Sequence, residues 1–120
     1  MILELKRRNY MDARFIVHFN LFAKAVCDIA IEKGWWDDVR NDGEMIALMH
    51  SELSEALESL RHGDPPSDHI PKFTGAEEEL ADVIIRIMDM AKGRGLRVAE
   101  AMVEKVKFNK TRPHKHGKRF

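Results

Sequence analysis

Apolar residues recur at spacings of three and four along four stretches of the chain, the pattern of helices that bury one face. The first stretch shows steps of four, three, four and three through Phe15, Phe19, Phe22, Val26 and Ile29. The pattern predicts helices over residues 12–33, 44–61, 76–92 and 97–110. No stretch alternates with the period of a strand. We therefore expect an all-α fold, a four-helix chain that forms an oligomeric helical bundle.

Turn-forming residues separate the four stretches. Gly34 follows the first, Asn41-Asp42-Gly43 precedes the second, and the segment 62–75 contains three prolines. Asp12 is the residue we expect to cap the start of the first helix. The chain of 120 residues is then one domain, 1–120, with a short N-terminal arm (1–11) and a basic C-terminal segment (111–120).

The third stretch is apolar on more than one side. Besides its main stripe, which includes Leu80 and Ile84, it carries Ala81, Ile85 and Met88 on a second arc. A helix that is apolar nearly all round must be covered nearly all round. A homodimer or homotetramer would supply that cover. The alternative is that the first or fourth helix covers the second arc within the chain.

Composition narrows the classes of function. Twenty Lys and Arg balance twenty Asp and Glu, so the net charge gives no bias towards nucleic acid or a membrane surface. No apolar run is long enough for a bilayer, and the first residues do not read as a secretory signal. Cys27 is the only cysteine, and we interpret it as a packed thiol. These features predict a cytoplasmic protein.

Two pairs of carboxylates lie three residues apart, Glu52 with Glu55 and Glu79 with Asp82. That spacing places both members of a pair on one face of a helix. On a helical wheel Glu52, Glu55 and Glu79 lie at the margin of the apolar stripe, whereas Glu58 lies on the solvated side. Burial of several carboxylates is costly unless a cation is present. The pairs therefore favour a site for a hard divalent cation, and the alternative is a solvated acidic face.

Basic residues dominate the chain after Glu104. Lys105 and Asn109 lie one helical turn apart, and an acidic metal cluster with a basic clamp is what phosphate chemistry requires. The alternative is a flexible basic end with weak affinity for nucleic acid. Trp35 and Trp36 begin a loop, where an indole ring can stack on a base or cover the core.

These motifs resemble those of the MazG-like, all-α nucleoside triphosphate pyrophosphohydrolases. The resemblance covers about residues 15–118. It rests on Glu52-x-x-Glu55, on Glu79-x-x-Asp82, and on the terminal run from Lys107 to Pro113 followed by Lys115-His116-Gly117-Lys118.

The resemblance implies a reaction and a site. Members hydrolyse a nucleoside triphosphate between the α and β phosphates, giving the monophosphate and pyrophosphate, and they control nucleotide pools. It implies Mg²⁺, with Mn²⁺ as a substitute, held by the four motif carboxylates, which are also the catalytic residues. It implies a dimer or tetramer with its active site near the subunit interface. The residues it assigns to phosphate binding are Lys105, Lys107, Asn109, Lys110 and Arg112. The aromatic residues that hold the base vary across the family, and we assign base binding to Trp35 and Trp36 from their place in the loop.

Three other functions compete with this hypothesis. A di-iron bundle would need Glu-x-x-His pairs, which neither motif has. A non-enzymatic helical oligomer would use its basic tail to bind nucleic acid or a protein partner, with binding that weakens steeply with salt. A related phosphohydrolase acting on another phosphoanhydride would release inorganic phosphate instead of pyrophosphate.

Overall fold

The computed structural model describes residues 1–120 and contains four α-helices. They are α1 (Ile2–Glu32), α2 (Asp42–Arg61), α3 (Gly75–Arg94) and α4 (Val98–Thr111), followed by a short 3₁₀ helix, η1 (His114–Gly117). The only strand-like pairing is an isolated bridge between Pro66 and Thr74. The prediction of an all-α, four-helix chain is confirmed, as is the loop between residues 62 and 74.

The start of the first helix differs from the prediction. α1 begins at Ile2, and Asp12 lies inside the helix, so the expected cap at Asp12 is wrong. Residues 2–11, which we expected as an arm, are helical and continuous with the rest of α1. The physical reason is that no Gly or Pro occurs between Met1 and Gly34, and Leu, Glu, Lys and Arg are all good helix formers.

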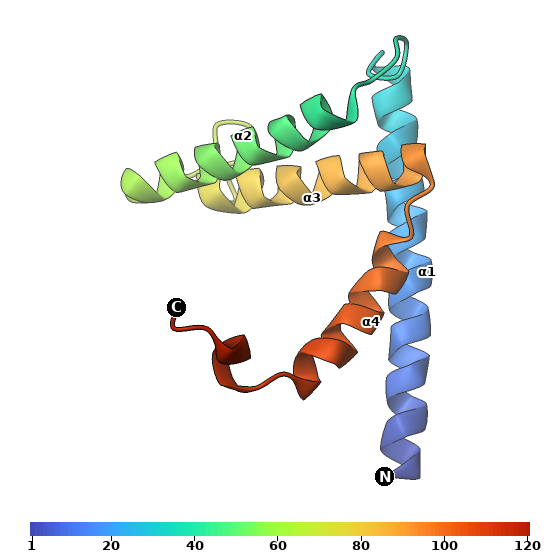
Figure 1. Cartoon of the computed structure of the whole chain (residues 1–120). Coiled ribbons are helices and arrows are strands. Elements are labelled where there is room, and N and C mark those ends of the chain that lie inside the picture. Colours follow the sequence, from blue (N-terminus) through green and yellow to red (C-terminus); the bar gives the residue numbers. More distant parts are fainter.

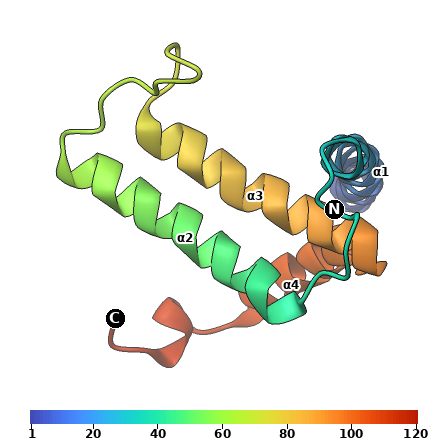
Figure 2. The same ribbon diagram turned by 90° about the horizontal axis from the view of Figure 1, so that it is seen from above.

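The helices are arranged as an antiparallel pair, α2 and α3, which α1 crosses steeply (Figures 1 and 2). α3 packs on α2 and also on the C-terminal part of α1. α4 turns away from the pair and packs on α1. The chain therefore has two regions, the α2–α3 pair with its α1 support and a splayed α1–α4 arm.

Caps fix the ends of the two helices that carry the carboxylate motifs. Asn41 accepts a hydrogen bond from the Glu44 backbone N–H at the start of α2. Thr74 and Glu77 form a reciprocal capping box at the start of α3. Gly95, with a φ of 67°, ends α3 in the left-handed conformation that glycine adopts without strain. The register of both motifs is thus set locally.

The core of a single chain is thin. Only 12 of the 120 residues are buried, and the buried apolar ones are Ala, Met and Cys27. The radius of gyration is 17.3 Å, whereas a compact domain of this length would have about 14 Å. None of the helices combines the length and the apolar character needed to cross a membrane. A large part of the apolar surface therefore remains uncovered in one chain.

The uncovered surface includes a second face of α2. Met45, Met49 and Ala56 are buried as the predicted stripe requires, but Leu53 and Leu60 of that stripe are exposed. Ile46 and Leu57 of the same helix are exposed as well. In α3, α1 provides part of the extra cover that we expected from a partner. Leu80 and Ile84 nevertheless remain 49% and 51% exposed.

Candidate functional site

Three carboxylates from two helices converge between α2 and α3. Glu52 and Glu55 of α2 and Glu79 of α3 each offer an oxygen, and these oxygens lie within 4.8 Å of one another. Asp82 lies one turn further along α3, outside this group of three, and is half-buried. The structure thus brings together three of the four predicted ligands and places the fourth nearby.

Burial within the cluster is graded. Glu52 is buried, with 8% of its surface exposed, Glu79 is half-buried and Glu55 is exposed. Glu58 of the same helix has a side chain that is 61% exposed, as the helical wheel predicted. Glu52 and Glu58 differ in exposure because they lie on different faces of α2, and only Glu52 faces α3.

The crowding of these carboxylates changes their proton affinity. Burial, the hydrogen bond with Glu52 and the charges of neighbouring acids raise the pKa of Glu79 to about 7. The hydrogen bond with Glu52 raises the pKa of Glu55, and burial raises the pKa of Asp82. Burial alone would raise the pKa of Glu52, but hydrogen bonds to Glu55 and Arg86 outweigh it and lower that pKa. The cluster therefore holds more negative charge than its surroundings stabilise at neutral pH.

Arg86 forms the only ion pair with the cluster. Its Nε and its terminal guanidinium nitrogen both lie 2.8 Å from Oε1 of Glu52. The sequence analysis gave Arg86 no role. The signal that was available is its spacing of four residues from Asp82, which puts the two side chains on one face of α3.

A cavity of about 240 Å³ opens beside the carboxylates. Trp35, Glu52, Asp82 and Arg86 line it, and Val26, Ile29 and Ile85 are among its apolar neighbours. The guanidinium of Arg86 lies 5.8 Å from the centre of the Trp35 ring. Lys33 and Arg40 also line the cavity, which thus joins an aromatic wall and three cations to the acidic cluster.

Trp36 occupies a different environment from Trp35. Its Nε1–H donates to a carboxylate oxygen of Asp89 at 2.8 Å, and Arg40 donates to the other oxygen at 2.6 Å. A Cβ atom on Gly93 would lie 2.2 Å from the Trp36 ring, so glycine is what allows this close packing inside α3. Trp36 therefore fastens the loop to α3, whereas the half-exposed Trp35 faces the cavity.

The predicted phosphate-binding residues lie on another part of the chain. Lys105, Lys107, Asn109 and Lys110 belong to α4, and Arg112 follows it. α4 packs on α1 and runs away from the α2–α3 pair (Figure 1). No ion pair joins any of them to the four carboxylates. One chain alone does not assemble the acidic cluster and the basic residues into one site.

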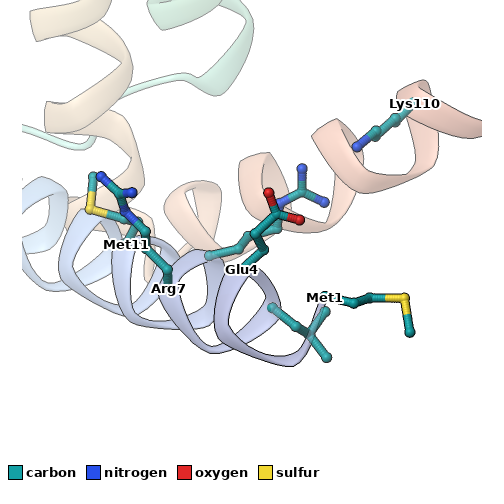
Figure 3. A pocket seen from close by; sticks show the side chains of 7 residues that line it. Met1, Glu4, Arg7, Met11 and Lys110 are labelled. Atoms are coloured by element: carbon teal, nitrogen blue, oxygen red, sulfur yellow. The ribbon is translucent and has the colours of Figure 1, made fainter.

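The basic residues of α4 instead contact α1 or their own helix. Lys107 lies 3.8 Å from Asp12 and 3.6 Å from Glu104, and Lys105 lies over the Phe108 ring. Figure 3 shows Lys110 directed from α4 towards the first turns of α1. There it lines a groove of about 600 Å³ together with Glu4, Arg7 and other residues of α1.

Comparison with family models, with curated proteins and with solved structures finds no match for the chain.

Proposed function

We propose that the chain is a metal-dependent pyrophosphohydrolase that cleaves nucleoside triphosphates between the α and β phosphates. The observation that carries the proposal is the convergence of Glu52, Glu55 and Glu79 from two helices, with oxygens within 4.8 Å of one another. Three mutually repelling carboxylates on a half-buried surface are a costly arrangement without a cation.

The donor set fits Mg²⁺, with Mn²⁺ as a substitute. All the candidate ligands are carboxylate oxygens, which hard divalent cations prefer, and the raised pKa of Glu79 reflects burial and a local excess of negative charge that a cation would balance. Glu52, Glu55, Glu79 and Asp82 would hold the ion. When bound, it would neutralise phosphate oxygens and lower the pKa of a coordinated water.

In the proposed reaction, the oxygen of a water molecule bonds to the α-phosphorus. The bond from that phosphorus to the bridging oxygen breaks, and pyrophosphate leaves. A carboxylate of the cluster accepts the proton of the water. The cavity beside the cluster would hold the nucleoside, with Trp35 as the surface on which the base stacks. Trp36 would act by keeping the loop in place.

The proposal includes a cytoplasmic homodimer or homotetramer. Two observations support self-association: the uncovered apolar faces of α2 and α3, and the separation of α4 from the carboxylates within one chain. A second copy of the chain would cover these apolar faces and could bring the basic residues of its α4 to the cluster. Light scattering coupled to size-exclusion chromatography should give two or four times the chain mass.

A panel of canonical and modified nucleoside triphosphates, assayed with and without Mg²⁺, tests the reaction. Pyrophosphate and monophosphate should appear in equal amounts and only with the metal. Release of inorganic phosphate would point to cleavage at the γ phosphate instead. No turnover of any substrate by the folded protein with metal present would reject the enzyme.

A second candidate function is polyanion or partner binding by the basic arm. The groove between α1 and α4, lined by Arg7, Arg8 and Lys110, favours it. It predicts binding of nucleic acid or of an acidic partner that weakens steeply with salt, and no metal-dependent turnover.

A further inference from the structure

Arg86 holds the most buried oxygen donor of the acidic cluster. It contacts Glu52 through two nitrogens at 2.8 Å, and the two side chains are only 26% and 10% exposed. It is also the only cation paired with any of the four carboxylates. In the absence of a metal, Arg86 therefore supplies the positive charge that makes burial of Glu52 tolerable.

A divalent cation would need the same carboxylate. Both nitrogens of Arg86 converge on Oε1 of Glu52, so a divalent cation bound to either oxygen of that carboxylate would lie close to the guanidinium and be repelled by it. An arginine guanidinium keeps its charge in proteins. It can give way only by moving.

The structure provides a place for it to move. Arg86 lines the cavity beside the cluster, and its guanidinium lies 5.8 Å from the centre of the Trp35 ring. It shares this ring with the guanidinium of Arg40, which is paired with Asp89 and lies 5.7 Å from the ring centre. The face of an indole ring attracts a guanidinium. Rotation of the Arg86 side chain would take the charge away from Glu52 and into the cavity.

We propose that Arg86 is a built-in counter-ion of Glu52, which it releases to an incoming divalent cation, and that the guanidinium then turns into the cavity to face an anionic ligand. Arg86 is thus a positioning residue that acts through Glu52. This inference rests on the proposed metal site. It adds that metal binding competes with a resident cation and that the same event turns a further positive charge into a cavity that Lys33 and Arg40 also line.

The test is a titration with Mn²⁺ in the absence of nucleotide, with free Mn²⁺ followed by electron paramagnetic resonance at about pH 8. Arg86→Gln removes the competing charge and should bind Mn²⁺ about tenfold more tightly, which is about 1.4 kcal/mol. Arg86→Lys keeps a charge but offers a less suitable donor geometry. Its affinity for Mn²⁺ should therefore fall between those of the wild-type protein and Arg86→Gln. The matched control is Arg94→Gln, which removes the same charge from the same helix, where Arg94 pairs with Asp42, and it should leave the affinity unchanged.

A purely structural role predicts the opposite sign, because loss of a supporting ion pair would loosen the ligands and weaken metal binding. Equal or weaker Mn²⁺ affinity in Arg86→Gln would therefore overturn the inference while leaving the metal site intact. Failure of the wild-type protein to bind Mn²⁺ would reject the metal site and the inference with it.

A second measurement uses the wild-type chain, in case Arg86→Gln does not fold. The ¹⁵N resonance of the Arg86 Nε–H reports its hydrogen bond to Glu52 directly. Saturation with Mg²⁺ should shift this resonance and speed the exchange of its proton with water, while the Nε–H of Arg94 stays unchanged. An Arg86 signal that does not respond to bound Mg²⁺ would also overturn the inference.

Discussion

The α2–α3 pair and the α1–α4 arm divide the charge of a neutral chain between them. Residues 15–96 carry eight Lys and Arg against sixteen Asp and Glu, whereas residues 1–14 and 97–120 together carry twelve against four. The first group forms the α2–α3 pair with its α1 support, and the second forms most of the arm. The net charge of the whole chain is zero, but its two regions carry opposite charges. The absence of an electrostatic bias therefore applies to the whole chain and not to each region.

The two regions also differ in how their side chains are held. The carboxylates of the α2–α3 pair lie on capped, mutually packed helices, and the most buried of them has an arginine partner. The basic residues of the arm are exposed, apart from the half-buried Arg112, and the only ion pairs that any of them forms are two long ones made by Lys107. This difference is expected if the carboxylates form a site within one chain. The basic residues would then become ordered only when a ligand or another copy of the chain binds them.

The largest effect should come from removal of a single charge in the acidic cluster. Glu79→Gln should lower Mg²⁺-dependent turnover by about a hundredfold or more, because the lost ligand is worth several kcal/mol in the transition state. Pyrophosphate release measures the turnover, and circular dichroism should show unchanged helical content.

Glu58→Gln is the matched control for this loss. It removes the same charge from the exposed side of α2 and should leave turnover near the wild-type value. Equal losses in the two variants would mean that the overall negative charge of the pair, and not the cluster, supports the reaction.

A smaller effect should follow from neutralising the arm. Replacement of Lys105, Lys107 and Lys110 by Gln should raise the KM for a nucleoside triphosphate by about tenfold, with a smaller change in kcat, because these cations would bind phosphate oxygens in the ground state and the transition state alike.

Mixing this variant with Glu79→Gln chains distinguishes action within a chain from action between chains. If α4 of one copy serves the carboxylates of another, hybrid oligomers contain some intact sites, and part of the activity should return. Unchanged activity after subunit exchange would place the basic residues and the carboxylates of an active site on the same chain.

The smallest effect concerns stability of the metal-free protein against pH. The pKa of Glu79 rises from 4.5 to about 7 on folding, so the folded state binds more protons than the unfolded state between those values. The free energy of unfolding should therefore fall as the pH rises through that window, by about 1 kcal/mol once solvent screening is allowed for. Urea unfolding at pH 5 and pH 8 measures this change. Glu79→Gln should flatten the dependence, and a wild-type stability that increases with pH would contradict the assigned crowding.

Sequence reasoning succeeded where the determinants are local. The ends of α2 and α3 lie within two residues of the predicted positions, because Asn41, the prolines of the loop and Gly95 act on their immediate neighbours. The face of Glu52 and the exposure of Glu58 followed from the helical period alone. These features need no knowledge of how the helices pack.

The remaining features depend on packing between helices. The ion pair of Arg86 with Glu52 joins residues 34 positions apart, and the bonds from Trp36 and Arg40 to Asp89 span 53 and 49 positions. Leu53 and Leu60 belong to the apolar pattern of α2 but face outward, because α3 covers a different arc of that helix. The placement of α4 on α1 rather than beside the carboxylates could not be read from spacing either.

The buried carboxylate of Asp89 fastens the loop that carries Trp35 at the two residues Trp36 and Arg40. The entropy lost in ordering this loop is therefore paid during folding and not when a ligand arrives. A ligand that reaches the cavity meets an aromatic wall already in place. Its association should then be limited by diffusion and by displacement of bound cations and water, and not by a slow closure of the loop.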